Sequence, residues 1–476
     1  MPLAYPRRTA LAAASAAFLL LAQSWALSGP PEAASPSPAR LGSANAASLW
    51  VQAIGPFLDQ VLADQLALLG IPGAAIAVVH GEEILHLAGY GKADLGGGQP
   101  VSPEDTLFRV GSVAKLLTWT AVMQLVEQGR LDPHGDVDRY LDRFQIPATF
   151  PESVTLAHLL THTAGFEERG FGPYARSARD LVPLGAFLAA QRPARIFPPG
   201  EVSAYSNYGA ALAGYLVERV SETPFEDYVE AHVLAPLGMT SSRFRQPLPP
   251  SLAAHLATGY RLSLAPGAFE WDLEGPAGAL SSTAADMARF MIAHLQKDRL
   301  GGVRILREET AEAMQRRQFA NHPAVSGLTY GFQELNLTGQ HVLVQPGDML
   351  YFTAALFLLP EQNLALFVAY NRGRASEAPT ELLRALLARL DPLAPWFLPA
   401  PPASSSDRDL GRFAGTYRST RRNESTLEKL QELFSPVRVR AVAPGTLWVS
   451  GLAVVPRALW VQTEPGVFRD QASPQL

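Results

Sequence analysis

The stretch Phe108-Arg-Val-Gly-Ser-Val-Ala-Lys115 holds one of only four lysines in a chain of 476 residues that has thirty-five arginines. In a chain so rich in arginine, a lysine is expected at sites that need an amine able to lose its proton, because a guanidinium stays charged in proteins. Ser112 and Lys115 lie three residues apart at the start of a helical pattern over residues 112–128, so their side chains share one helix face. A hydroxyl beside a base at the positive end of a helix suits an acyl-transfer nucleophile. The stretch therefore predicts a serine hydrolase.

Helical and strand patterns surround this stretch in an order that predicts the fold. Five further helices are expected, over residues 47–69, 180–191, 207–220, 225–233 and 283–297. Strands are expected in a hairpin and in a later group, over residues 74–80, 84–89, 340–345, 351–359 and 364–371, before a last helix over 375–390. This order predicts an α+β fold, with an antiparallel sheet flanked by N- and C-terminal helices and an inserted all-α subdomain. A small β-rich C-terminal region follows it.

The chain divides into five predicted parts, two of which are linkers rich in Pro, Ala and Ser. They are a signal peptide (1–28), a linker (29–45), a hydrolase domain (46–391), a second linker (392–406) and a β-rich C-terminal region (407–476) that this sequence need not contain in full.

The N-terminus predicts export. Arg7 and Arg8 precede an apolar run that ends near Ala22 and is followed by small residues, the pattern of a secretory signal. The apolar run is short for a bilayer span, so cleavage is favoured over a retained anchor. We therefore expect a periplasmic or secreted bacterial enzyme, in contact with the membrane only if the leader is uncleaved.

Composition excludes several other classes. The formal net charge is -5 and no basic tract occurs, which argues against a nucleic-acid partner. The chain has no cysteine, and its ten histidines show no HExxH spacing, so neither a metal site nor a cofactor is expected. The expected partner is a small-molecule or peptide substrate, and the sequence leaves the oligomeric state open.

A second constellation lies in the segment Pro198-Pro-Gly-Glu-Val-Ser-Ala-Tyr-Ser-Asn-Tyr-Gly209, where a turn leads into a helix. A tyrosine held near a lysine can lose its proton more easily, so Tyr205 could carry the proton from nucleophile to leaving group. Asn207 offers a donor and an acceptor that could fix Lys115 or the substrate carbonyl. Tyr208 competes for the role of Tyr205, and spacing alone does not separate the two.

Together these motifs resemble the serine β-lactamase-related superfamily, which includes class C β-lactamases, penicillin-binding proteins, D-amino-acid peptidases and esterases. The similar segments fall within residues 50–390 and are 108–115, 156–165, 199–209, 234–239 and 277–286. The resemblance implies that Ser112 is the nucleophile, that Lys115 assists as base, and that Tyr205 with Asn207 forms the partner motif. It also implies that the run containing His158 and His162 is a structural turn and not a catalytic one.

The third motif of that superfamily is altered in this chain. Where the superfamily has Lys-Thr-Gly or His-x-Gly, the equivalent here is Gln345-Pro346-Gly347, followed by Asp348; His341 is the alternative if the alignment is shifted. The N–H groups of Asp348 and Ser112 would form the oxyanion hole.

Gln345 is neutral, so a cation that could hold a substrate carboxylate is missing at this position. Loss of one charge-assisted contact costs roughly 1.5–3 kcal/mol. We therefore expect an ester or short peptide amide as substrate. A β-lactamase or D-alanyl carboxypeptidase is an alternative, and a non-catalytic scaffold related to penicillin-binding proteins is another.

Overall fold

The structure is a computed structural model that describes residues 44–170, 172–337, 339–390, 410–434, 436–451 and 457–470. The predicted signal peptide, nearly all of the first linker and the whole second linker lie outside the described residues.

A seven-stranded sheet forms the centre of the fold, and every neighbouring pair of its strands is antiparallel. The strand order is β10-β11-β12-β13-β1-β2-β3, so the first strand of this sheet along the chain pairs with its last, β13. The strands are β1 Gly73–His80, β2 Glu83–Asp94, β3 Gln99–Pro100, β10 Gln333–Leu337, β11 Gln340–Asp348, β12 Thr353–Leu359 and β13 Leu364–Tyr370.

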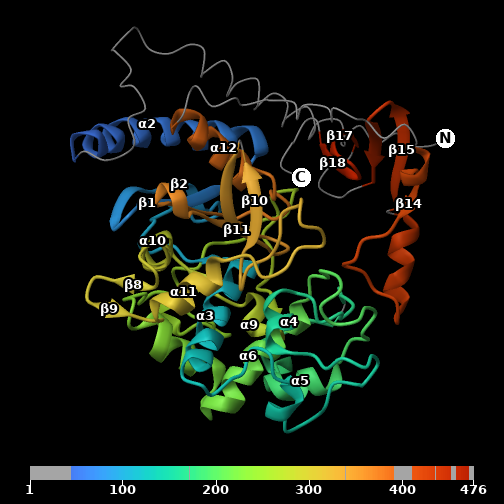
Figure 1. The fold of residues 1–476 in the computed structure, drawn as a ribbon. Helices are drawn as coiled ribbons and strands as arrows, with labels where there is room; N and C mark the ends of the chain where they lie inside the picture. Colours follow the sequence, from blue (N-terminus) through green and yellow to red (C-terminus); the bar gives the residue numbers. More distant parts are fainter. Residues whose placement is uncertain are drawn as a thin grey trace, which may run out of the picture.

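Two helices, α2 (Ala44–Leu69) and α12 (Ala378–Leu390), cover one face of this sheet (Figure 1). In α2, apolar residues recur every four positions at Ile54, Leu58, Leu62 and Leu66, and all four are buried. Together with inward side chains of the sheet they form one continuous core. The predicted α+β fold with flanking terminal helices is therefore confirmed.

The helical insertion covers the opposite face. Helix α10 (Ala284–Leu295) packs on β1 and β13, and below it α3 (Ala114–Glu127) packs against α6 (Asn207–Ser221) (Figure 1). Every α3 residue from Ala114 to Leu125 is buried, so this helix lies in the core and not at the surface. The remaining helices are shorter: α4 Leu156–Leu160, α5 Leu184–Ala190, α7 Phe225–Val229, α8 Pro250–Ala253, α9 Gly275–Gly278 and α11 Glu308–Gln315.

Short strand pairs join the parts of the insertion: β4 Phe108–Arg109 with β7 Ser281–Ser282, β5 Tyr174–Ala175 with β6 Trp271–Asp272, and β8 Arg299–Leu300 with β9 Val303–Arg304. Helix α5 is shorter than the predicted 180–191 because Pro183, in an extended conformation, precedes its first turn. The predicted 225–233 helix changes after Val229 into a wider π turn, Glu230–Leu234.

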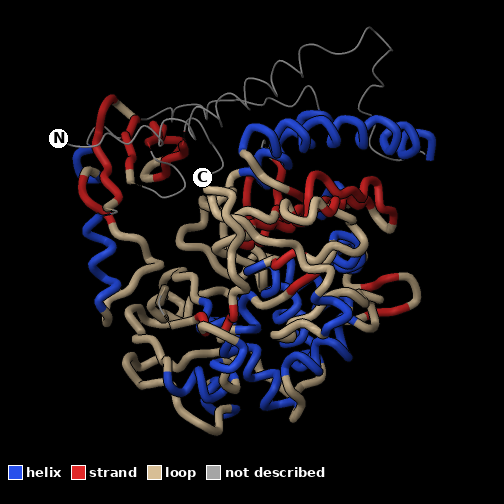
Figure 2. The backbone as a smooth tube through the Cα atoms, turned by 180° about the vertical axis from the view of Figure 1, so that it is seen from behind, coloured by secondary structure: helices blue, strands red, loops and turns tan. Residues whose placement is uncertain are grey.

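The C-terminal region forms its own five-stranded antiparallel sheet beside the rest of the described chain (Figure 2). Its strands are β14 Gly415–Tyr417, β15 Val437–Ala443, β16 Thr446–Ser450, β17 Arg457–Glu464 and β18 Val467–Asp470. Leu410, Leu447 and Val449 form its small core. Residues Leu427–Phe434 of this region form a run of 3₁₀ turns.

Within the described ranges, no helix combines the length and hydrophobicity that crossing a bilayer requires.

Candidate active site

The turn before α3 holds Ser112 at the junction of sheet and insertion. Gly111–Val113 form a 3₁₀ turn that leads directly into the helix, and Gly111 has a φ of 54°, which suits glycine. One turn later, Lys115 is fully buried, and its Nζ lies 2.8 Å from Ser112 Oγ. The two side chains thus share one helix face, as their spacing predicts.

The amine of Lys115 has three oxygen neighbours, and their chemistry differs. Besides Ser112 Oγ, the Asn207 side-chain oxygen and the Ala277 carbonyl oxygen each lie 2.8 Å from Nζ. Those two can only accept protons, whereas a serine hydroxyl can also donate one. As an ammonium, Lys115 donates to all three oxygens. If the amine loses one proton, it can keep donating to Asn207 and Ala277 and accept from Ser112, the arrangement that general-base catalysis needs.

Tyr205 lies beside this pair, and Tyr208 does not. The Lys115 Nζ is 4.9 Å from the centre of the Tyr205 ring, which is half-buried just before α6. The Tyr208 hydroxyl instead donates to the Leu188 carbonyl in the core, 3.1 Å away. The structure therefore separates the two candidates that spacing alone leaves open.

The two histidines have structural partners. His158 belongs to a capping box at the start of α4, where its Nδ1 accepts the Thr155 N–H at 3.1 Å. His162 stacks on the Tyr205 ring at 4.2 Å, and its Nδ1 accepts the Ser206 N–H at 3.3 Å. Burial first, and then the charges of Lys115 and Arg421, lower the pKa of His162 to about 3. A neutral His162 thus supports the ring of Tyr205.

The end of β11 reaches the serine turn at Gly347. A Cβ on Gly347 would lie 2.0 Å from the Val110 carbonyl oxygen, so only glycine permits this approach. The Met349 N–H donates to the Phe352 carbonyl, so Met349 points its backbone groups towards β12. Because backbone groups in an antiparallel pair point to alternate sides from one residue to the next, the backbone N atoms of Pro346 and Asp348 point away from β12. Strand β10 pairs with β11 only up to Val344, so beyond it this edge of β11 has no strand partner within the described sheet. An ideal Cβ on Gly111 would be 3.1 Å from Asp348 N, which locates that donor beside the serine turn.

The structure places Gln345, and not His341, beside the close contact of β11 with the serine turn. Gln345 lies two residues before Gly347, whereas His341 pairs with Asn336 and its ring lies 3.3 Å from Glu334 on the β10 side. The Gln345 side chain is buried, and its amide donates to the adjacent Pro346 carbonyl at 2.8 Å. It therefore brings no charge to the end of β11 beside the serine turn.

Two acidic residues near Lys115 were not found from the sequence. Glu168 accepts the Asn207 side-chain amide at 2.8 Å and its backbone N–H at 3.2 Å, which fixes the Asn207 oxygen towards Lys115. Glu274 is buried; burial and then the carboxylates of Asp272 and Glu168 raise its pKa well above the ordinary 4.5. Glu168 belongs to the pair Glu167-Glu168 after Gly165-Phe166, but nothing in that pattern indicates its partner.

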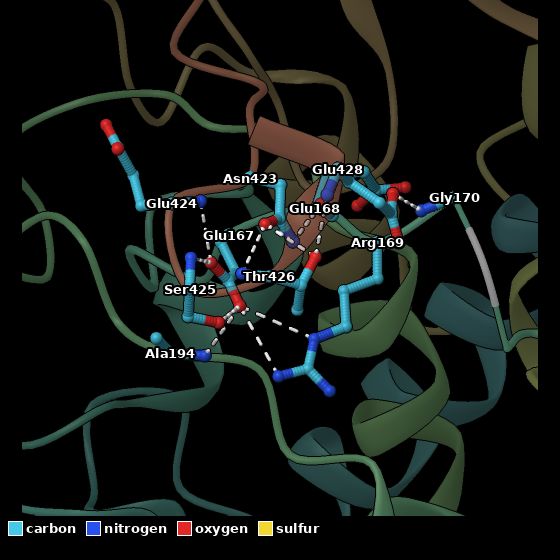
Figure 3. Close-up of polar contacts among 10 residues, drawn as sticks. All are labelled: Glu167, Glu168, Arg169, Gly170, Ala194, Asn423, Glu424, Ser425, Thr426 and Glu428. Atoms are coloured by element: carbon cyan, nitrogen blue, oxygen red, sulfur yellow. Dashed lines mark hydrogen bonds and ion pairs between the residues drawn. The ribbon is translucent and has the colours of Figure 1, made fainter. Parts of the chain in front are cut away.

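The C-terminal region also contacts the site (Figure 3). Buried Glu167 accepts the backbone N–H groups of Glu424 and Ser425 at 2.9 Å each, and the Glu168 N–H donates to the Arg422 carbonyl at 3.0 Å. Arg421 is thereby placed over the Tyr205 ring, 4.7 Å from its centre, and donates to Glu168 at 3.0 Å. No local motif marks Arg421 in the sequence.

Comparison with known proteins gives a family and several relatives. Residues 58–390 match the family model described as beta-lactamase. Penicillin-binding protein 4 of Amycolatopsis lactamdurans is 30% identical over 379 residues, covering 73% of this chain and 93% of that protein. A β-lactamase of Yersinia enterocolitica is 28% identical over 323 residues, covering 68% of this chain and 79% of the relative.

Solved structures share the fold at lower identity. The octameric penicillin-binding protein homologue from Pyrococcus abyssi aligns with a TM-score of 0.61 at 22% identity, covering 87% of this chain and 94% of the other. A class C β-lactamase from Rhodobacter sphaeroides aligns with a TM-score of 0.58 at 20% identity, covering 71% of this chain and 99% of the other.

Proposed function

The chain belongs to the β-lactamase family, whose members are serine hydrolases, and from that premise we propose that it hydrolyses an ester or short peptide amide through an acyl-enzyme on Ser112. The observation that carries this proposal is the Lys115 amine, buried and 2.8 Å from Ser112 Oγ. Its two other neighbours are acceptors that cannot give it a proton.

The proposed reaction has two steps. Ser112 Oγ attacks the substrate carbonyl while its proton passes to Lys115, and Tyr205 supplies a proton to the departing alcohol or amine. The N–H groups of Ser112 and Asp348 stabilise the oxyanion. Water then attacks the acyl-enzyme and gives a proton to the Tyr205 phenolate, while Lys115 returns a proton to Ser112 Oγ as the acid leaves. Asn207, held by Glu168, keeps Lys115 in place during both steps.

A pre-steady-state experiment tests the acyl-enzyme. With a p-nitrophenyl ester we expect a burst of nitrophenol close to one equivalent per enzyme, followed by slower turnover. Ser112→Ala abolishes both phases, whereas Ser251→Ala, at an exposed position on α8, leaves them unchanged. Full turnover by Ser112→Ala would exclude the assignment.

The scaffold alternative is separated from the enzyme by covalent labelling. A fluorescent phosphonate or penicillin labels an active Ser112, and labelling by neither probe would favour a non-catalytic binding protein. Nitrocefin and D-alanyl peptides are assayed beside the esters. Hydrolysis of nitrocefin indicates a β-lactamase, and hydrolysis of D-alanyl peptides indicates a carboxypeptidase, whereas hydrolysis of the esters alone indicates an esterase.

We also propose that the enzyme acts outside the cytoplasm, which rests on the leader at residues 1–28. Expression of the full chain in a bacterium, followed by cell fractionation and N-terminal mass analysis, tests this. A mature N-terminus near residue 28 in the periplasm or medium supports export, and an intact N-terminus in the cytoplasm contradicts it.

A further inference from the structure

Arg421 extends from the C-terminal region to the proposed catalytic groups. Its guanidinium carbon lies 4.7 Å from the centre of the Tyr205 ring, and one Nη donates to Glu168 Oε1 at 3.0 Å. Through Glu168 and Asn207 it joins the hydrogen-bonded chain that ends at Lys115. Yet 253 residues separate Arg421 from Glu168 in the sequence.

The loop that carries Arg421 is held on both sides. The Arg421 N–H donates to Ser419 Oγ at 3.1 Å, and the next guanidinium, Arg422, stacks on Phe197 at 4.8 Å. Asn423 is buried, and the two residues after it donate to Glu167 (Figure 3). The guanidinium of Arg421 is therefore presented by a docked loop and not by a free end of chain.

Part of this guanidinium remains open for a ligand. The side chain is 51% exposed, and within the described residues its donors other than the one bound to Glu168 have no acceptor. An arginine has five N–H donors in a planar fork that fits a carboxylate with two parallel hydrogen bonds. Arg421 can therefore bridge Glu168 on one edge and a second carboxylate on another.

The position of Arg421 indicates which part of a bound substrate it would contact. Tyr205 is the proposed proton donor to the leaving group, so a cation over its ring lies on the leaving-group side. Gln345 is buried and neutral and offers no such charge from β11. We propose that Arg421 is a specificity-determining residue that binds a carboxylate carried by the leaving group, such as the C-terminal carboxylate of a short peptide. This inference rests on the proposed function and adds its substrate class.

Two thioesters with the same acyl group test the proposal. The leaving group is thioglycolate in the anionic thioester and the methyl ester of thioglycolate in the neutral one. The two differ only in the carboxylate, and because the chain has no cysteine, a thiol reagent reports the product alone. We expect the wild-type enzyme to prefer the anionic thioester, and the preference to fall as salt is raised. In Arg421→Ala the loss in kcat/KM for the anionic thioester exceeds the loss for the neutral one by at least about tenfold, mainly through KM. Arg421→Lys retains part of the preference.

Arg440→Ala is the matched control, because Arg440 is an exposed arginine of the same region that stacks on Trp448. It should keep the wild-type ratio. An equal loss for both thioesters in Arg421→Ala and Arg421→Lys, or a wild-type enzyme without preference, would overturn the proposal and leave the hydrolase intact. Absence of turnover of either thioester by the wild-type chain would instead remove the proposed function, and this inference with it.

Discussion

At the scale of single residues, Lys115 could not be exchanged for the arginine that this chain uses elsewhere. Its Nζ contacts three oxygens at 2.8 Å inside a buried space. A guanidinium would keep its charge there and could not accept the proton of Ser112. The rarity of lysine in the sequence is thus consistent with a position that requires a titratable amine.

We expect Lys115→Arg and Lys115→Met each to slow acylation by roughly 10²–10⁴-fold, the usual contribution of a general base. Methionine conserves most of the volume, so its variant tests the loss of the amine without overpacking. Burst kinetics measure the rate, and thermal unfolding checks the fold. Lys92→Arg, at an exposed position on β2, is the control and should acylate normally. A near-normal burst in Lys115→Met would contradict the assignment of the base.

Glu274 predicts a dependence of stability on pH. Because its folded pKa is raised above the unfolded 4.5, the native state keeps a proton that the unfolded state has lost. The contribution of Glu274 to the free energy of unfolding therefore falls as pH rises from about 4.5 towards the folded pKa, by about 1.4 kcal/mol for each unit of difference.

Glu274→Gln removes that loss, so its melting temperature relative to wild type should increase between pH 4 and pH 8. Calorimetry across this range measures the difference. Glu201→Gln, at an exposed position, should show no such trend. A difference between Glu274→Gln and wild type that stays constant with pH would mean that Glu274 is ionised in the folded protein.

At the scale of elements, the sequence predicts the helices and most strands, but it places the end of one strand, β11, too early. Strand β11 was expected over 340–345 because Pro346 and Gly347 normally end strands. It continues to Asp348, since β10 pairs with it only up to Val344 and the backbone N of Pro346, which has no N–H, points to that uncovered edge and not to β12. A residue pattern cannot reveal which edge of a strand lacks a partner.

Gly347→Ala tests the contact between β11 and the serine turn. The added methyl would lie 2.0 Å from the Val110 carbonyl oxygen, so strand and turn must separate. We expect the free energy of unfolding to fall by about 1–3 kcal/mol. We also expect kcat to fall in the protein that remains folded, because the Asp348 N–H moves away from Ser112. Gly302→Ala, where a Cβ meets nothing within 4 Å, is the matched control. Unchanged kcat in Gly347→Ala would show that β11 does not form the oxyanion hole.

At the scale of the whole molecule, the candidate site is built from five separate parts of the chain, around Ser112, Glu168, Tyr205, Gly347 and Arg421. Local motifs predict Ser112, Lys115, Tyr205 and Asn207, because each motif places its residues within one or two turns of a helix. The same reasoning cannot predict Arg421, whose relation to Glu168 depends on how the C-terminal region docks. That docking depends in turn on Glu167, a buried carboxylate without a helical or strand pattern around it.

Docking through Glu167 should therefore depend on its charge. Burial opposes ionisation, but hydrogen bonds from Ser425, Glu424 and Ala194 outweigh it and lower the pKa of Glu167 below the ordinary 4.5. A carboxyl with a depressed folded pKa contributes stability that is present above its unfolded pKa and is lost as pH falls through the folded value. The contacts of the C-terminal region should thus loosen only below about pH 4.5.

Hydrogen exchange at the amides of Glu424 and Ser425 measures this docking directly, because both donate to Glu167. In Glu167→Gln we expect their protection, corrected for intrinsic exchange rates, to fall at least about tenfold at neutral pH, since a charge-assisted acceptor is lost. The wild-type chain should show the same fall below pH 4.5, while amides of β1 stay protected in both chains. Glu201→Gln serves again as the exposed control. Protection of Glu424 and Ser425 that survives Glu167→Gln would mean that other contacts hold the C-terminal region, and Arg421 with it, over the site.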